Sequence, residues 1–92
     1  MSIERRATKI YLKELPPLTV LELLDKYHIP SPYKEILIAV CVERLKDFPA
    51  LDFLEEKFKI HIGYWDFRKK TSKALDIFRK SHLTFGKKNG IK

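Results

Sequence analysis

Seven consecutive apolar residues, 36–42, form the longest apolar run in this 92-residue chain. A helix that crosses a membrane needs about 20 such residues, so this run is expected to lie in the core of a folded domain. Its β-branched residues favour a strand, whereas Pro32 before it and the polar continuation 43–46 favour a helix. We expect a buried helix over about residues 31–46, with Ser31 as its N-cap.

Two shorter helices are expected on either side of this run. Thr19 and Glu22 have the spacing of a capping box and predict a helix over about residues 20–27, which Pro30 would end. Asp47, two residues before a proline, is the expected cap of a helix that runs over about residues 49–58.

Residues 2–14 have two interpretations. Thr8, Ile10 and Leu12 alternate with polar residues, as in a short strand, whereas Ile3, Ala7 and Ile10 would suit one face of a helix. We favour a strand or an extended arm. A second very short strand is an alternative to a turn over residues 59–62, which Gly63 closes.

Residues 64–81 contain neither glycine nor proline and predict the longest helix. At about 100° per residue, one side of this helix is largely apolar. That side carries Tyr64, Phe67, Thr71, Ala74, Leu75 and Phe78. The opposite side, termed the basic arc, carries Arg68, Lys69, Lys73, Arg79 and Lys80, with Trp65 and Ser72 among them. The segment therefore predicts an amphipathic helix with a buried side and a cationic side.

Together these segments predict a mainly α fold, a bundle of about four helices with up to two very short strands. A chain of this length is expected to form a single domain, assigned to residues 1–85. Residues 86–92 are expected to form a flexible basic tail, because they contain two glycines and few apolar residues.

The net charge of +7 is concentrated in the second part of the chain. Residues 1–56 hold eight basic and ten acidic side chains, which gives −2, whereas residues 57–92 hold eleven basic and two acidic ones, which gives +9. Such asymmetry favours a polyanionic partner, most often nucleic acid. The alternative is a soluble protein with a lysine-rich tail.

The segments 49–58, 59–63 and 64–81 resemble a helix-turn-helix in their order only. The usual residue pattern fits at Leu54, Phe58 and Ile60, but Lys59 stands where glycine is common. The turn is therefore expected to be longer than the standard one, or the unit to be a different three-helix arrangement.

The leading hypothesis is a small DNA-binding protein, a regulator or accessory factor in transcription, with duplex DNA as its partner. Cationic side chains on one helix face bind phosphates, and a helix fits the major groove. The expected nucleic-acid-binding residues are Trp65, Arg68, Lys69, Ser72, Lys73, Arg79, Lys80, Lys87 and Lys88. Trp65 has an alternative role, because a tryptophan at a helix start often packs over a neighbouring helix.

No catalytic, metal-binding or cofactor motif is present in the sequence. The three histidines are far apart, a single cysteine gives no zinc spacing or disulfide, and the three glycines form no phosphate-binding loop. We therefore expect no enzymatic activity, no cofactor and no metal.

Two other classes of function remain open. Exposed aromatic residues would suit a protein-interaction module or a homodimer, and the mixture of aromatic and basic residues over 64–70 would suit RNA or a single strand. No membrane partner is expected. Residues 1–6 lack the apolar stretch of a secretory signal, and Cys41 lies within an apolar run as a buried, reduced thiol would. The expected location is therefore the cytoplasm.

Overall fold

A computed structural model describes residues 3–88 of the chain, and the side chains of residues 3–84. The helices are α1 (Ile3–Glu14), α2 (Pro17–Lys26), α3 (Tyr33–Leu37), α4 (Asp47–Phe58) and α5 (Tyr64–Lys88). α3 continues directly into a π-helical turn, η1 (Ile38–Val42). Over the described residues there is no strand, so the mainly α prediction is confirmed.

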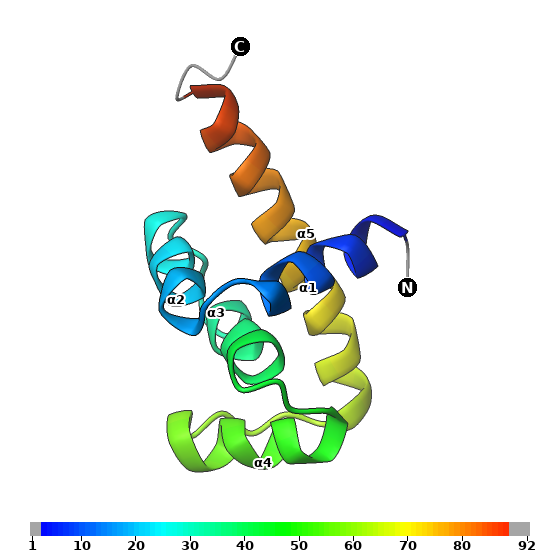
Figure 1. The fold of residues 1–92 in the computed structure, drawn as a ribbon. Coiled ribbons are helices and arrows are strands. Elements are labelled where there is room, and N and C mark those ends of the chain that lie inside the picture. The colour runs from blue at the N-terminus through cyan, green and yellow to red at the C-terminus, as the bar shows by residue number, and fades with distance from the viewer. Residues whose placement is uncertain (1–2, 89–92) are drawn as a thin grey trace.

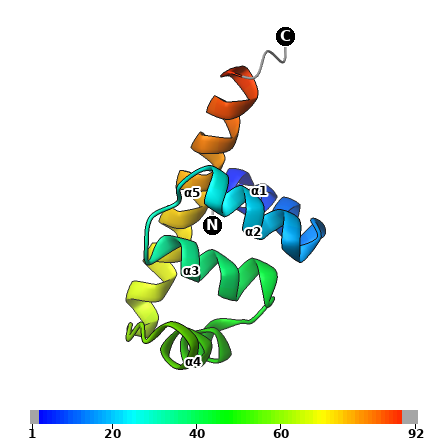
Figure 2. The ribbon, with the colours of Figure 1, turned by 90° about the vertical axis from the view of Figure 1, so that its left-hand side faces the viewer.

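The long helix α5 runs through the whole molecule. Figure 1 shows α1 crossing its middle and α4 lying across its N-terminal end. In the second view α3 lies between α4 and the pair formed by α1 and α2 (Figure 2). This arrangement places α3 and η1 at the centre of the bundle.

The apolar run at residues 36–42 forms the core, as predicted. Ile36, Leu37 and Ala39 have no exposed surface, and Val40 and Cys41 are almost completely buried. The helix ends at Val42, earlier than residue 46, because Arg44 has a positive φ of 57°, outside the right-handed helical region, and Lys46 is already the N-cap of α4. Its N-cap is Pro32, so the cap expected at Ser31 was wrong.

The predicted inner face of α5 packs on this core. Phe67, Ala74, Leu75 and Phe78 are buried, and Thr71 is buried with its hydroxyl donating to the carbonyl oxygen of Phe67 at 2.7 Å. A buried hydroxyl with a partner avoids the cost of an unsatisfied polar group. The apolar side of α5 is therefore confirmed.

The strand or extended arm expected over residues 2–14 was wrong, because α1 occupies this segment. Thr8 and Leu12, one helical turn apart, are the residues that α1 buries. Ile10, which suggested alternation, is 50% exposed. Burial of one helical face thus prevails over the alternating pattern.

The other expected N-caps were also wrong. α2 begins at Pro17 with Pro16 as its N-cap, so Thr19 already lies within the helix and no capping box forms. A proline at the start of a helix loses no hydrogen bond, because the first N–H groups have no partner inside the helix. α4 has Lys46 as its N-cap, and Asp47 lies in the first turn instead.

The connection over residues 59–63 doubles back along α4. Lys59 ends α4 in the left-handed conformation, with φ 59° and ψ 31°. The chain then returns along α4, so that α5 begins beside the start of α4 (Figure 1). The rings of Phe48 and Tyr64 stack there, 5.2 Å between centroids. The two helices are thus joined by a longer connection than the standard helix-turn-helix has.

α5 extends past the predicted end at residue 81 and reaches Lys88. The side chains of residues 85–88 and all of residues 89–92 lie outside the described residues. The basic tail at 86–92 and the single domain at 1–85 therefore stay predictions.

Candidate functional site

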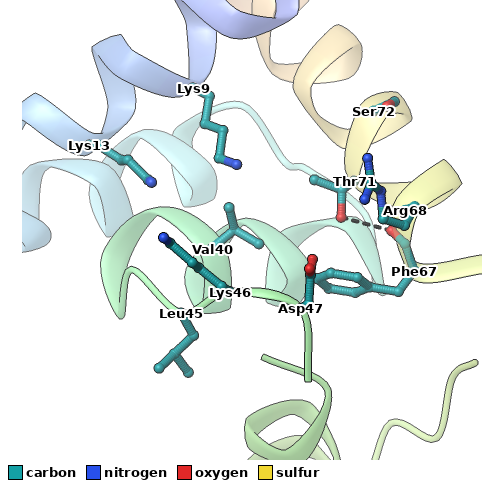
Figure 3. A pocket seen from close by; sticks show the side chains of 10 residues that line it. All are labelled: Lys9, Lys13, Val40, Leu45, Lys46, Asp47, Phe67, Arg68, Thr71 and Ser72. Atoms are coloured by element: carbon teal, nitrogen blue, oxygen red, sulfur yellow. Dashed lines mark hydrogen bonds between the residues drawn. The ribbon is translucent and has the colours of Figure 1, made fainter. Parts of the chain in front are cut away.

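A pocket of about 280 Å³ opens between α1, the segment before α4, and the N-terminal half of α5 (Figure 3). It is smaller than the range of about 300–1,000 Å³ that is usual for sites of drug-sized ligands. Its lining residues are Lys9, Lys13, Val40, Leu45, Lys46, Asp47, Phe67, Arg68, Thr71 and Ser72. A pocket of this size suits a small group rather than a whole cofactor.

Four cationic side chains and one acid line this basic pocket. Lys9 and Lys13 come from successive turns of α1, Lys46 from the N-cap of α4, and Arg68 from α5. Asp47 is the acid. Figure 3 shows Lys9 and Lys13 pointing from α1 toward the space above Lys46 and Asp47. Three segments distant in sequence therefore bring an excess of positive charge to one place.

The positively charged side chains in the pocket repel one another. The pKa of Lys9 is lowered, first because the ammonium group loses water by burial and next because Lys13 lies nearby. A lowered lysine pKa means that the fold disfavours the charged form. A bound anion would counter both effects, so this environment favours an anionic ligand.

Arg68 forms one wall of the pocket and contacts an aromatic ring. Its Nη1 donates to the Tyr64 hydroxyl at 3.0 Å, and its guanidinium lies 5.9 Å from the centroid of the Tyr64 ring. The hydrogen bond to Tyr64 is the main cause of a raised pKa for Arg68. Arg68 thus keeps its charge and is held in place by its neighbour one turn earlier.

Three aromatic residues lie beside Arg68 and form an exposed aromatic cluster: Phe48, Tyr64 and Trp65. Tyr64 stacks on Phe48 and meets Trp65 edge to face at 5.0 Å. Phe48 is 64% exposed and Trp65 is 74% exposed, whereas Tyr64 is half-buried between them. Trp65 therefore does not pack over a neighbouring helix, which was its alternative role.

The predicted residues of the basic arc separate into two groups. Toward the N-terminal end of α5, Arg68 and Ser72 line the pocket, and Trp65 belongs to the aromatic cluster. Lys69, Lys73 and Lys80 are exposed, and the ammonium group of Lys73 lies 5.6 Å from the ring centroid of Tyr33.

The C-terminal part of the basic arc is partly covered by α1. Arg79 is half-buried and forms an ion pair with Glu4 at 3.9 Å. Asp76 lies on the same side of α5 and holds Arg5 by a salt bridge at 2.8 Å. Lys87 and Lys88 lie where side chains are not described. Among the described residues of α5, Arg68, Lys69 and Lys73 form an open cationic surface on the N-terminal half, and Lys80 is exposed further along the helix.

Sequence reasoning missed Lys9, Lys13, Lys46 and Phe48 as parts of the site. Lys9 and Lys13 follow Arg5 at intervals of four residues, a helical spacing that places all three on one side of α1. This signal was available, but the interpretation as a strand concealed it. Nothing in the sequence indicates that Lys46 and Phe48 lie beside them.

No family model, curated protein or solved structure matches this chain. The function must therefore be inferred from the geometry of its own residues. Within the described part of the chain, none of the helices has the length and apolar character needed to cross a membrane. The described residues also hold no group of three or more His, Cys, Asp or Glu suited to a metal ion.

Proposed function

We propose that this protein binds nucleic acid, with DNA as the expected form, by holding backbone phosphates in the basic pocket. One observation carries the proposal: Lys9, Lys13, Lys46 and Arg68 converge from three segments, with Asp47 as the one acid among the lining residues. A phosphate group bears the charge that these side chains favour and is small enough for the space.

The cationic surface continues beyond the pocket, as a polyanion requires. Lys69 is exposed next to Arg68 on α5, and Lys73 lies one turn further. Successive phosphates of one strand would therefore meet the pocket and then the outer side of α5. Each contact releases condensed counterions, which supplies a large part of the affinity.

α5 offers a route to base edges in duplex DNA. Its N-terminal half presents Arg68, Lys69 and Ser72 away from the core, whereas α1 covers part of the side beyond them. A helix that enters the major groove by its N-terminal half reads bases from such positions. A regulatory or accessory role in transcription, inside the cell, would follow from such binding and belongs to the same proposal.

The test is a titration of labelled DNA, duplex and single-stranded, followed by fluorescence anisotropy at several salt concentrations. Binding is expected to weaken with salt, with a slope of log K against log salt of about −4 for four or five phosphate contacts. Lys13→Gln and Arg68→Gln should each reduce the steepness of that slope by about 1.

Lys57→Gln is the matched control, since it removes the same charge from the exposed last turn of α4, and Lys57 is not among the residues that line the pocket. It should leave the slope nearly unchanged. No retention of either DNA at low salt contradicts the proposal. Equal reductions of the salt slope in all three variants would mean that binding depends on net charge and not on the basic pocket.

A further inference from the structure

Much of the surface of the aromatic cluster is not packed against the rest of the protein. Phe48 and Trp65 leave 64% and 74% of their area open, whereas the rings that stabilise the core, such as Phe67 and Phe78, are almost completely buried. Tyr64 lies between the two exposed rings, and its hydroxyl accepts a hydrogen bond from Arg68. The central ring is thus held in place, and most of the surface of Phe48 and Trp65 remains accessible to a ligand.

The aromatic cluster and the basic pocket share a boundary. Phe48 directly follows Asp47, which lines the pocket, and Tyr64 contacts Arg68, which forms its wall. A strand whose phosphate lies in the pocket would therefore bring its attached sugar and base to these rings. Arg68 connects the two surfaces, because it lines the basic pocket and donates a hydrogen bond to Tyr64 of the aromatic cluster at 3.0 Å.

We propose that Phe48 and Trp65 stack unpaired bases of a single-stranded nucleic acid whose phosphates lie in the basic pocket. This inference rests on the proposed function and adds single strands to the ligands whose phosphates the basic pocket would hold. In a duplex the faces of the bases are covered by their neighbours in the stack, whereas a single strand exposes them. Base–aromatic stacking tolerates any sequence, because every base has a π-face.

The charge around the aromatic cluster favours this occupant over a protein surface. Arg68 contacts Tyr64, Lys69 follows Trp65 by about one turn of α5, and the pocket adds further cations from α1. Asp66, the acid next to Trp65, is engaged by Lys70 at 3.7 Å. Protein interfaces also use exposed aromatic residues, but this combination of rings with convergent cations matches the bases and phosphates of one strand.

The single tryptophan of the chain allows a direct test. The intact protein is titrated with oligodeoxyuridylate, with oligouridylate and with a duplex of equal length, while Trp65 fluorescence is recorded. Stacking predicts saturable quenching by the single strands and little quenching by the duplex. A difference between oligodeoxyuridylate and oligouridylate, which differ only in the 2′-hydroxyl, would identify DNA or RNA as the preferred strand. Either preference supports the stacking inference, and a preference for RNA would overturn DNA as the form named in the proposed function.

Trp65→Ala should weaken binding of labelled single strands about tenfold or more, with the salt slope and duplex binding retained. Phe58→Ala is the control, because Phe58 is a partly exposed aromatic at the opposite end of α4 (Figure 1). It should leave single-strand affinity unchanged. Circular dichroism establishes that both variants fold, as expected for side chains outside the core.

Salt-dependent binding without quenching, and with equal affinities for Trp65→Ala and the wild type, would overturn this inference and leave the proposed function standing. Absence of binding to every oligonucleotide would overturn both. A change in Trp65 fluorescence that follows protein concentration alone would assign the aromatic cluster to self-association and overturn the inference.

Discussion

Arg5 and Asp76, 71 positions apart, form a two-pronged salt bridge between the first and the last helix. Nε of Arg5 donates to Oδ1 of Asp76 at 3.0 Å, and Nη2 donates to Oδ2 at 2.8 Å. Paired hydrogen bonds of this kind fix orientation as well as distance. Lys9 and Lys13 lie one and two turns further along the same side of α1, so the salt bridge helps to place them at the pocket.

Asp76→Asn should lower stability near neutral pH and much less in acid. The hydrogen bonds from Arg5 are the first cause of a lowered pKa for Asp76, whose ordinary value is 3.8. A carboxyl group whose pKa is lowered by folding stabilises the fold at pH values above its pKa in the unfolded chain. This contribution is lost as the pH falls through its pKa in the folded protein. Thermal unfolding at about pH 7 and about pH 3 measures the change. If the melting temperatures of variant and wild type differed by the same amount at both pH values, the result would contradict this prediction.

Asp47→Asn should tighten anion binding, because it removes the acid from the basic pocket. A partly exposed charge of this kind contributes about 0.2–1 kcal/mol, so the dissociation constant for DNA should fall by up to about fivefold. Anisotropy at low salt measures it, with Asp52→Asn, an exposed acid of the same helix, as the control. Equal tightening in both variants would indicate a general charge effect and argue against the pocket.

Lys59→Gly should stabilise the protein by about 1 kcal/mol, because Lys59 holds the left-handed conformation at the end of α4. Glycine adopts that conformation without steric cost. Urea unfolding gives the change, and Lys57→Gly, within the last turn of the helix, should instead destabilise by about 1 kcal/mol. Loss of stability in Lys59→Gly would be inconsistent with this backbone conformation.

Leu75→Ala should destabilise the fold by about 2–5 kcal/mol, since it leaves a cavity at a residue with no exposed surface. Leu83→Ala, on the same helix but 53% exposed, should have a much smaller effect. Chemical denaturation of both variants makes the comparison. Similar losses would mean that the buried face of α5 is assigned incorrectly.

The Cys41 thiol should react slowly with an aromatic disulfide reagent at mildly alkaline pH while the protein is folded. Burial raises its pKa to about 11, and the thiolate is the reactive form. Denaturant should release a fast reaction of one thiol per chain. Rapid labelling of the native protein would show that the core around Cys41 opens readily.

Local patterns in the sequence were sufficient for much of the fold. The apolar run at 36–42 could only be buried, and the helical spacing of Phe67, Leu75 and Phe78 identified the inner face of α5. Burial of this kind depends on the identity and the period of neighbouring residues, which a sequence contains directly. The same pattern indicated that Trp65 and Arg68 lie away from the core.

The composition of the candidate site was decided by the tertiary structure. The sequence of residues 3–14 alternates as a strand would, but packing on α5 buries one helical face, and the segment forms α1. In this helix Lys9 and Lys13 line the same pocket as Arg68. The connection that doubles back places Phe48 against Tyr64. The sequence determined which residues are cationic or aromatic, and it identified the buried side of α5. The packing of α1 and α4 on α5 determined which of them meet, because contacts between distant segments depend on the position of whole helices.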